Sequence, residues 1–163
     1  MSSQVLRPQV SPSALTAWVR LLRAHASATR ELSAQLQAEH GLTINDYEAL
    51  LHLSRAENAA MRRIDLAGRL LLTPSGVTRL LDGLEDAGFV CKGSCPGDAR
   101  VTYAVLTEAG RTKLEQASCS HIAAVNDLFE SRLSNDELAT LATLLERLTG
   151  ASGDGEDCSA GHT

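Results

Sequence analysis

The residues best suited to contact another molecule lie at the start of a helix predicted from Thr73 to Ala87. A threonine followed by proline is typical of a helix N-terminus, because the hydroxyl accepts a free backbone N–H and proline lacks the N–H that would stay unpaired. Leucine and valine at helical spacing take one face, which leaves small polar residues and one arginine on the other. Such side chains suit hydrogen bonds to base edges and phosphates. The candidate DNA contacts on this helix are Thr73, Ser75, Gly76, Thr78 and Arg79.

A second group of candidates lies in a predicted β-hairpin, here called the wing. Residues 89–92 and 101–106 alternate in polarity as strands do, and the turn-rich residues 93–99 join them. Lys92, Asp98 and Arg100 are its charged candidates for DNA contact. Arg100 suits insertion into a minor groove, with Asp98 holding its guanidinium group. An Asp and an Arg two residues apart more often form a solvated surface pair, but their position after two helices and a turn favours the DNA contact.

Two cysteines also lie in the wing and suggest redox chemistry. Cys91 and Cys95 flank Lys92, which would lower a thiol pKa, and a disulfide between them would deform the hairpin. The alternative is that Cys91 packs as a small hydrophobic residue under the wing and that Cys95 is an incidental surface thiol.

Other kinds of site are not marked in the sequence. The sequence has no phosphate-binding glycine loop, HExxH motif or nucleophile elbow, so we expect no enzyme and no cofactor. The five histidines are scattered, which predicts no metal site. A small-molecule pocket is expected where the first long helix meets the following helices, and its candidate lining residues are Trp18, His25, Tyr47 and His52. Trp18 and Tyr47 would otherwise be ordinary core residues.

Long helices on either side must position these residues. Ser11-Pro12 begins a helix whose apolar series continues at three- and four-residue spacing to Gly41. Thr43 and Asp46 form a capping pair for a second helix, and residues 63–71 form a third with an apolar face at Ile64, Leu66, Ala67, Leu70 and Leu71. Met61 suggests a short third strand. Thr107 caps another long helix with Leu114, His121 and Ile122 on its buried side, and Ser134 and Glu137 cap the last helix, which Gly150 ends.

Composition limits the architecture to one structural unit. A chain of 163 residues that is 44% apolar and only 3% aromatic favours helices packed on helices. Its net charge of −5 argues against a generally nucleic-acid-binding surface, although basic residues gather in the segment 62–100. No apolar run reaches the roughly 18 residues of a membrane span, so we expect no membrane contact and a cytoplasmic location.

The ordered set of motifs resembles the MarR family of bacterial transcription regulators. The similarity lies in Leu66-Ala67, in the segment from Pro74 to Val90, in Asp98-x-Arg100, and in Leu106-Thr107-Glu108-Ala109-Gly110. It implies a mainly α fold with a small β-wing, a winged helix-turn-helix between long N- and C-terminal dimerisation helices. It also implies a homodimeric repressor that binds a pseudo-palindromic operator in double-stranded DNA and is released by a small-molecule effector or an oxidant.

The expected organisation follows from this resemblance and from the capping residues. It comprises a flexible arm (1–10), an N-terminal dimerisation helix (11–41), a winged helix-turn-helix DNA-binding lobe (42–106), C-terminal dimerisation helices (107–149) and a disordered acidic tail (150–163). The alternative function is a winged-helix protein-protein interaction module without DNA binding, which suits the acidic net charge. The two differ in salt dependence, because only binding to phosphates weakens steeply with salt.

Overall fold

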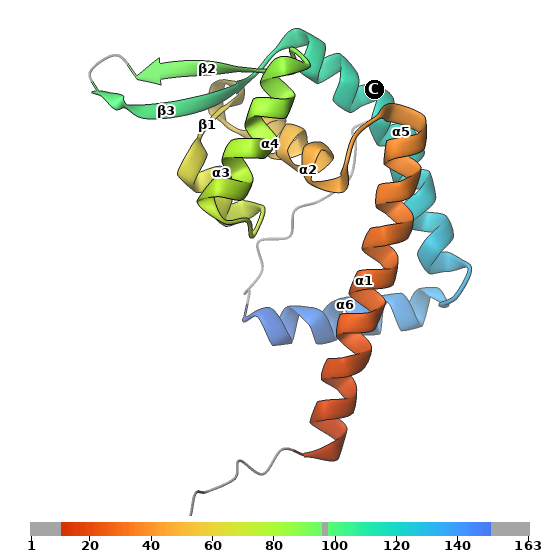
Figure 1. Ribbon diagram of the computed structural model, residues 1–163. Helices are drawn as coiled ribbons and strands as arrows, with labels where there is room; N and C mark the ends of the chain where they lie inside the picture. The colour runs from red at the N-terminus through yellow and green to blue at the C-terminus, as the bar shows by residue number, and fades with distance from the viewer. Residues whose placement is uncertain (1–10, 96–97, 151–163) are drawn as a thin grey trace, which may run out of the picture. The chain divides into compact units, whose positions relative to one another are not determined.

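The fold is mainly helical with one small sheet (Figure 1). The computed structural model describes residues 11–95 and 98–150, with side chains for all of these except 94–101. The predicted arm, the acidic tail beyond Gly150 and the side chains of Cys95, Asp98 and Arg100 therefore lie outside the described residues. In chain order the elements are α1 (Pro12–His40), α2 (Ile44–Arg55), a 3-10 turn (Glu57–Ala59), β1 (Ala60–Arg62), α3 (Arg63–Arg69), α4 (Pro74–Asp86), β2 (Val90–Cys95), β3 (Asp98–Leu106), α5 (Glu108–Glu130) and α6 (Asn135–Thr149).

The helix boundaries follow the capping residues. The Thr43 hydroxyl accepts the backbone N–H of Asp46, while the Asp46 carboxylate accepts the N–H of Thr43 at 2.8 Å. The Glu137 carboxylate similarly accepts the Ser134 N–H at 2.9 Å, which lowers the pKa of Glu137. Gly41 and Gly150 end α1 and α6 with φ of 67° and 66°, a conformation that glycine adopts without strain. The predicted helix boundaries are confirmed at these positions.

The sheet is antiparallel with the strand order β1-β3-β2. The predicted third strand at Met61 is confirmed as β1, which pairs with β3 through Met61 and Ala104. The wing is longer than predicted, since β2 continues to Cys95 and β3 begins at Asp98. Backbone pairing continues through residues whose composition suggested a turn, with a register shift between Ser94 and Cys95. Figure 1 shows the two strands extending as a hairpin beyond α3 and α4.

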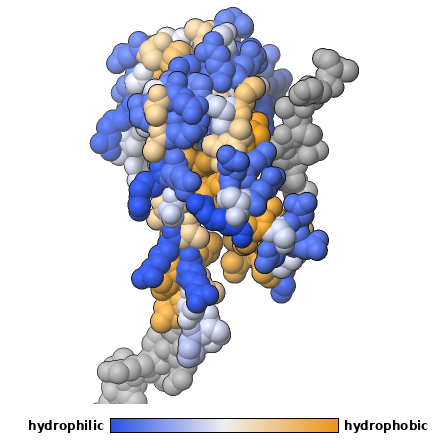
Figure 2. All heavy atoms as spheres, turned by 90° about the vertical axis from the view of Figure 1, so that its right-hand side faces the viewer, coloured by the Kyte–Doolittle hydropathy of each residue, from blue (hydrophilic) through white to orange (hydrophobic). Residues whose placement is uncertain are grey.

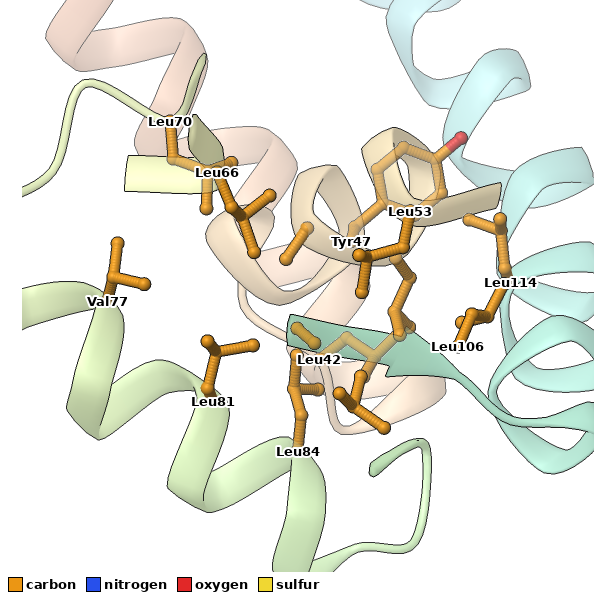
Figure 3. Packing of buried hydrophobic residues seen from close by; sticks show 14 of the residues in the cluster. Leu42, Tyr47, Leu53, Leu66, Leu70, Val77, Leu81, Leu84, Leu106 and Leu114 are labelled. Carbon is orange, nitrogen blue, oxygen red and sulfur yellow. The ribbon is translucent and has the colours of Figure 1, made fainter. Parts of the chain in front are cut away.

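The core lies where α2, α3 and α4 pack against the sheet and the start of α5. Leu50, Leu53, Leu66 and Leu81 are completely buried. Figure 3 shows Val77, Leu81 and Leu84 of α4 on the side that faces the cluster, as the period of the helix predicts. The side of α4 opposite this buried stripe is thereby left for contact with another molecule.

Several apolar residues predicted on buried faces are exposed. Ile64 and Leu71 are 72% and 92% exposed, so the buried face of α3 is narrower than predicted. The helix ends at Arg69, and Leu71 adopts a φ of 52°, which turns its side chain away from the core. Ile122 on α5 is also exposed. The prediction that these three residues are buried in the single chain is wrong.

The chain divides into two compact units, Met1–Ala124 and Val125–Thr163, with the boundary inside α5. In the first unit, Leu32 and Leu36 of α1 are buried, whereas the apolar residues of its N-terminal half are exposed. In the second, α6 has no buried residue. Among the described residues, no helix is both long and apolar enough to cross a membrane.

Candidate nucleic-acid interface

The outer face of α4 carries the polar residues predicted to contact DNA. Ser75, Thr78 and Arg79 are exposed, and Val77 between them is buried. The Thr73 hydroxyl accepts the N–H of Gly76 at 3.2 Å, which confirms Thr73 as the N-cap. Thr78 donates to the carbonyl of Pro74 at 3.0 Å, which fixes its side chain against the first turn. Within the described part of the chain, no hydrogen bond or ion pair engages Arg79, so its guanidinium group is free to bind a partner.

Gly76 lies in the first turn of α4, where there is little room for a side chain. A Cβ atom at this position would lie 3.2 Å from the Thr73 hydroxyl oxygen and 3.7 Å from Cβ of Leu72. A side chain here would therefore crowd the N-cap. Gly76 therefore allows a tight first turn of α4, and its contact with DNA stays a prediction.

The charged group of Lys92 is already paired within the chain. Its Nζ lies 2.9 Å from Oε2 of Glu85 on α4, and Oε1 of Glu85 lies 3.3 Å from Nη2 of Arg63 on α3. Arg63 also lies 3.6 Å from the Asp82 carboxylate. Lys92 was predicted to contact DNA, and that contact stays a prediction; the structure pairs its ammonium group with the Glu85 carboxylate at the end of α4. The ion pair between Lys92 and Glu85 could not be predicted from the sequence, because it depends on how the turn at Gly88 places β2 beside α4.

The backbone of the wing places Asp98 and Arg100 on the return strand β3, as predicted. Their side chains lie outside the described residues, so their contact with DNA stays a prediction.

The two wing cysteines do not lie close to each other. Cys91 and Cys95 are on the same strand, opposite Val105 and Asp98 of β3. Four residues of strand span about 13 Å, and a disulfide requires Cα atoms within about 7 Å. The predicted disulfide would therefore require β2 to come apart. The alternative also fails for Cys91, whose side chain is exposed rather than packed under the wing.

The four predicted pocket residues do not line one cavity within a single chain. Trp18 is 57% exposed and His25 is exposed, both in the N-terminal half of α1. Tyr47 is instead a core residue, buried against α5. His40, at the end of α1, contacts the same region of α5, and His25 lies about 22 Å further along the helix. His52 is half-buried on α2. A hollow on α1 is lined by His25 and its helical neighbours, and none of the other three contributes to it.

A polar cluster that the sequence analysis did not recognise lies where α1, α2 and α5 meet. The Tyr47 hydroxyl lies 3.2 Å from Oγ of Ser118, and its ring centroid lies 4.5 Å from that of His121. Nε2 of His40 lies 2.7 Å from Oγ of Ser120. His121 is buried, and its Nδ1 has no hydrogen-bond partner among the described residues. Burial lowers the pKa of His121, because the charged form loses its water.

The cluster brings together two histidines with hydroxyl groups, and no carboxylate or thiol is among its members. No group of three or more potential ligands gathers anywhere in the described residues. Its position instead connects α5 to the helices that support the sheet.

Hydrogen bonds join the turn that follows α4 to the residue that precedes α5. Oγ1 of Thr107 donates to the Gly88 carbonyl at 2.7 Å, and the N–H of Thr107 donates to the Phe89 carbonyl at 3.1 Å. A Cβ on Gly110 would lie 2.1 Å from that Phe89 oxygen. Because the contact is so close, α5 and the turn that follows α4 must move together.

Comparisons with known proteins agree with this geometry. The sequence profile of the MarR family matches residues 40–101. The HTH-type transcriptional repressor YetL of Bacillus subtilis is 30% identical over 115 residues, which cover 69% of each chain.

Two solved structures share the fold. AbsC, a MarR family transcriptional regulator from Streptomyces coelicolor, superposes with a TM-score of 0.78 at 30% identity, covering 88% of this chain and 97% of its own. A mutant MarR from E. coli, solved in complex with operator DNA, gives 0.72 at 26% identity, covering 82% and 94%. The chain therefore belongs to the MarR family of DNA-binding transcription regulators.

Proposed function

We propose that the protein is a homodimeric repressor that binds a pseudo-palindromic operator. In this proposal α4 enters the major groove, where Ser75, Thr78 and Arg79 contact bases or phosphates, and Arg100 of the wing reads the adjacent minor groove. The observation that carries the proposal is the outer face of α4, which is polar and exposed and presents Arg79, a residue with no ion pair among the described residues. The repressor YetL and the operator complex of the E. coli MarR support it by similarity.

The apolar surface of α1 supports the homodimer. Leu15, Trp18, Val19 and Leu22 follow one stripe of the helix and are 37% to 57% exposed. Figure 2 shows apolar atoms at the surface of this end of α1. A second copy of the chain would bury such a stripe. In the second unit, Leu144, Leu145 and Leu148 of α6 are exposed as well. The dimer would place two α4 helices about 34 Å apart, one turn of B-DNA.

The bonds between α4 and α5 support a route for regulation. A ligand that favours one arrangement of the dimer helices would move α5, and the contacts of Thr107 and Gly110 would transmit that movement to the end of α4. A small-molecule effector fits this route better than a Cys91–Cys95 disulfide, which β2 opposes. As a regulator of transcription, the protein would act in the cytoplasm, where bacterial DNA lies.

The rival function, a protein-interaction module without DNA binding, lacks a supporting observation of its own. Its basis was the acidic net charge of the chain, but the face of α4 that would meet DNA carries the exposed, basic Arg79. Membership in the MarR family favours the regulator.

The proposed contact surface is tested by Arg79→Ala. Loss of a base contact weakens operator binding by roughly 1 to 3 kcal/mol. Binding of the purified dimer to the DNA upstream of its own gene is measured by fluorescence anisotropy. The matched control is Arg147→Ala, which removes an exposed arginine from α6. Equal affinities for wild type and a folded, dimeric Arg79→Ala protein would show that α4 is not the contact surface.

A further inference from the structure

We infer that Glu85 is a positioning residue for DNA recognition, and that Lys92 connects the wing to α4 instead of contacting a phosphate. The inference rests on the proposed function, because it assumes that α4 and the wing contact the same DNA. It concerns how this chain sets the position of one contact element relative to the other.

The geometry joins three elements through one carboxylate. Glu85 of α4 uses Oε1 for Arg63 of α3 at 3.3 Å and Oε2 for Lys92 of β2 at 2.9 Å. Asp82, one helical turn earlier, adds a second acceptor for Arg63 at 3.6 Å. Each carboxylate oxygen of Glu85 is thus paired with a cation from a different element.

Burial distinguishes the Arg63–Glu85 pair from an ordinary surface pair, whereas the Lys92 side chain that binds the same carboxylate is 58% exposed. The side chains of Glu85 and Arg63 are only 18% and 24% exposed. Nε of Arg63 is fully buried and has no hydrogen-bond partner among the described residues. Pairs between exposed side chains contribute little because water competes for them, but removing one member of a shielded group leaves its partner charge uncompensated.

The place of Glu85 along α4 shows that it does not serve the helix itself. It lies in the last turn of Pro74–Asp86, where the helix dipole disfavours a negative charge. Arg63 and Lys92 supply the compensating positive charge. The Glu85 carboxylate is therefore unfavourable for α4 itself, and its ion pairs instead join α4 to α3 and β2.

Lys92 lies near the base of the wing, where a fixed angle has the largest effect. It is the third residue of β2, opposite Ala104 of β3. The next residue, Gly93, packs so closely that a Cβ there would lie 2.8 Å from Cγ2 of Val105. This close packing joins the two strands of the wing to each other, and the Lys92–Glu85 ion pair joins the start of the wing to α4. The orientation of the rest of the hairpin relative to α4, including the position of Arg100, would then depend on how this base is held.

The test separates positioning from phosphate contact by the salt dependence of binding. Each lost phosphate contact lowers the slope of log affinity against log salt by about 1. We expect Lys92→Met and Glu85→Gln each to weaken operator binding about tenfold while the slope stays at the wild-type value. Both substitutions remove the Lys92–Glu85 pair, and Glu85→Gln also removes the pair with Arg63, so the double variant should bind no more weakly than Glu85→Gln alone.

Three controls separate positioning from general loss of structure. Glu115→Gln removes an exposed carboxylate of α5 and should bind as wild type does. Lys92→Arg keeps a cation that reaches Glu85 and should restore operator affinity. Affinity for DNA of scrambled sequence should not change in Lys92→Met, because loss of folding would lower both affinities equally. Every protein is compared below its own melting temperature.

The outcomes distinguish this inference from the proposed function. A slope reduced by about 1 in Lys92→Met, or equal losses on operator and scrambled DNA, would overturn the positioning role. If the wild-type protein shows no salt-dependent binding to operator DNA, the proposed function itself fails.

Discussion

At the scale of single residues, His121 combines burial with a pKa below its ordinary value. The ring is buried against Tyr47, and its Nδ1 has no partner in the described part of the chain. Burial lowers the pKa of His121 in the folded protein, so the unfolded chain binds a proton at a pH where the folded chain does not. Stability contributed by neutral His121 is therefore fully present above a pH of about 6.5 and is lost as the pH falls below that value.

The pH dependence is measured by urea denaturation between neutral and mildly acidic pH. The free energy of unfolding should fall with decreasing pH in the wild type, and His121→Phe should flatten that fall because it keeps a ring against Tyr47 without a titrating group. His25→Gln, at an exposed position of α1, should leave the dependence unchanged. An unaltered profile in His121→Phe would exclude this residue as its source.

The local sequence pattern predicted which residues cap a helix and which of its residues are exposed. The cap at Thr73 and the exposure of Ser75 and Arg79 followed from helical spacing. The pairing of Lys92 with Glu85 did not, because it joins a strand to a helix across the turn at Gly88. His121 was predicted on a buried face, but its unpaired nitrogen depends on which neighbours surround it.

At the scale of elements, the turn that follows α4 is joined closely to the start of α5. Gly110, in the first turn of α5, lies against the Phe89 backbone, and the added Cβ of alanine would come within 2.1 Å of the Phe89 oxygen. Because backbone atoms cannot give way as a flexible side chain can, Gly110→Ala should lower the free energy of unfolding by about 1 to 3 kcal/mol.

Thermal and urea denaturation check this expectation. The matched control is Gly83→Ala in α4, where an added Cβ meets no atom within 4 Å and alanine has the higher helix propensity. That variant should be as stable as the wild type or more stable. A Gly110→Ala protein with wild-type stability would mean that α5 and the turn after α4 are not tightly joined.

The bounds of helices and strands were predicted well where capping residues mark them. They were predicted less well where contacts between elements determine how far an element extends. The starts of α2, α4 and α6 coincide with Thr43, Thr73 and Ser134. The wing was predicted too short because glycine, serine and proline suggested a turn where backbone pairing continues. Ile64 was placed in the core because its spacing fits a helical face, but the following turn leaves no partner for it.

At the scale of the whole molecule, the exposed stripe of α1 predicts dimerisation. Leu22→Glu would place a charge among Leu15, Trp18 and Val19, so the proposed dimer should dissociate at concentrations where the wild type remains associated. Sedimentation equilibrium measures this directly. Ala24→Glu, on the opposite side of the same helix, should keep the wild-type state. If Leu22→Glu associates as tightly as the wild type, this stripe is not the interface.

The sequence pointed to the family through an ordered set of motifs, and the profile match and related structures confirm it. The single-chain fold explains why the predicted pocket could not be located from sequence. Trp18 and His25 lie far along α1 from the region where Tyr47 is buried. A site that includes Trp18 and His25 together with Tyr47 would therefore need surfaces from more than one chain. The spacing of residues along one sequence does not show how two chains meet.

The most direct test of the account is a titration of the reduced wild-type protein onto the DNA upstream of its own gene at two salt concentrations, with scrambled DNA of equal length as competitor. A regulator that reads bases through α4 should prefer the natural sequence by at least about a thousandfold and should bind more weakly at the higher salt. Binding that ignores both sequence and salt would contradict the assignment of this face to operator DNA.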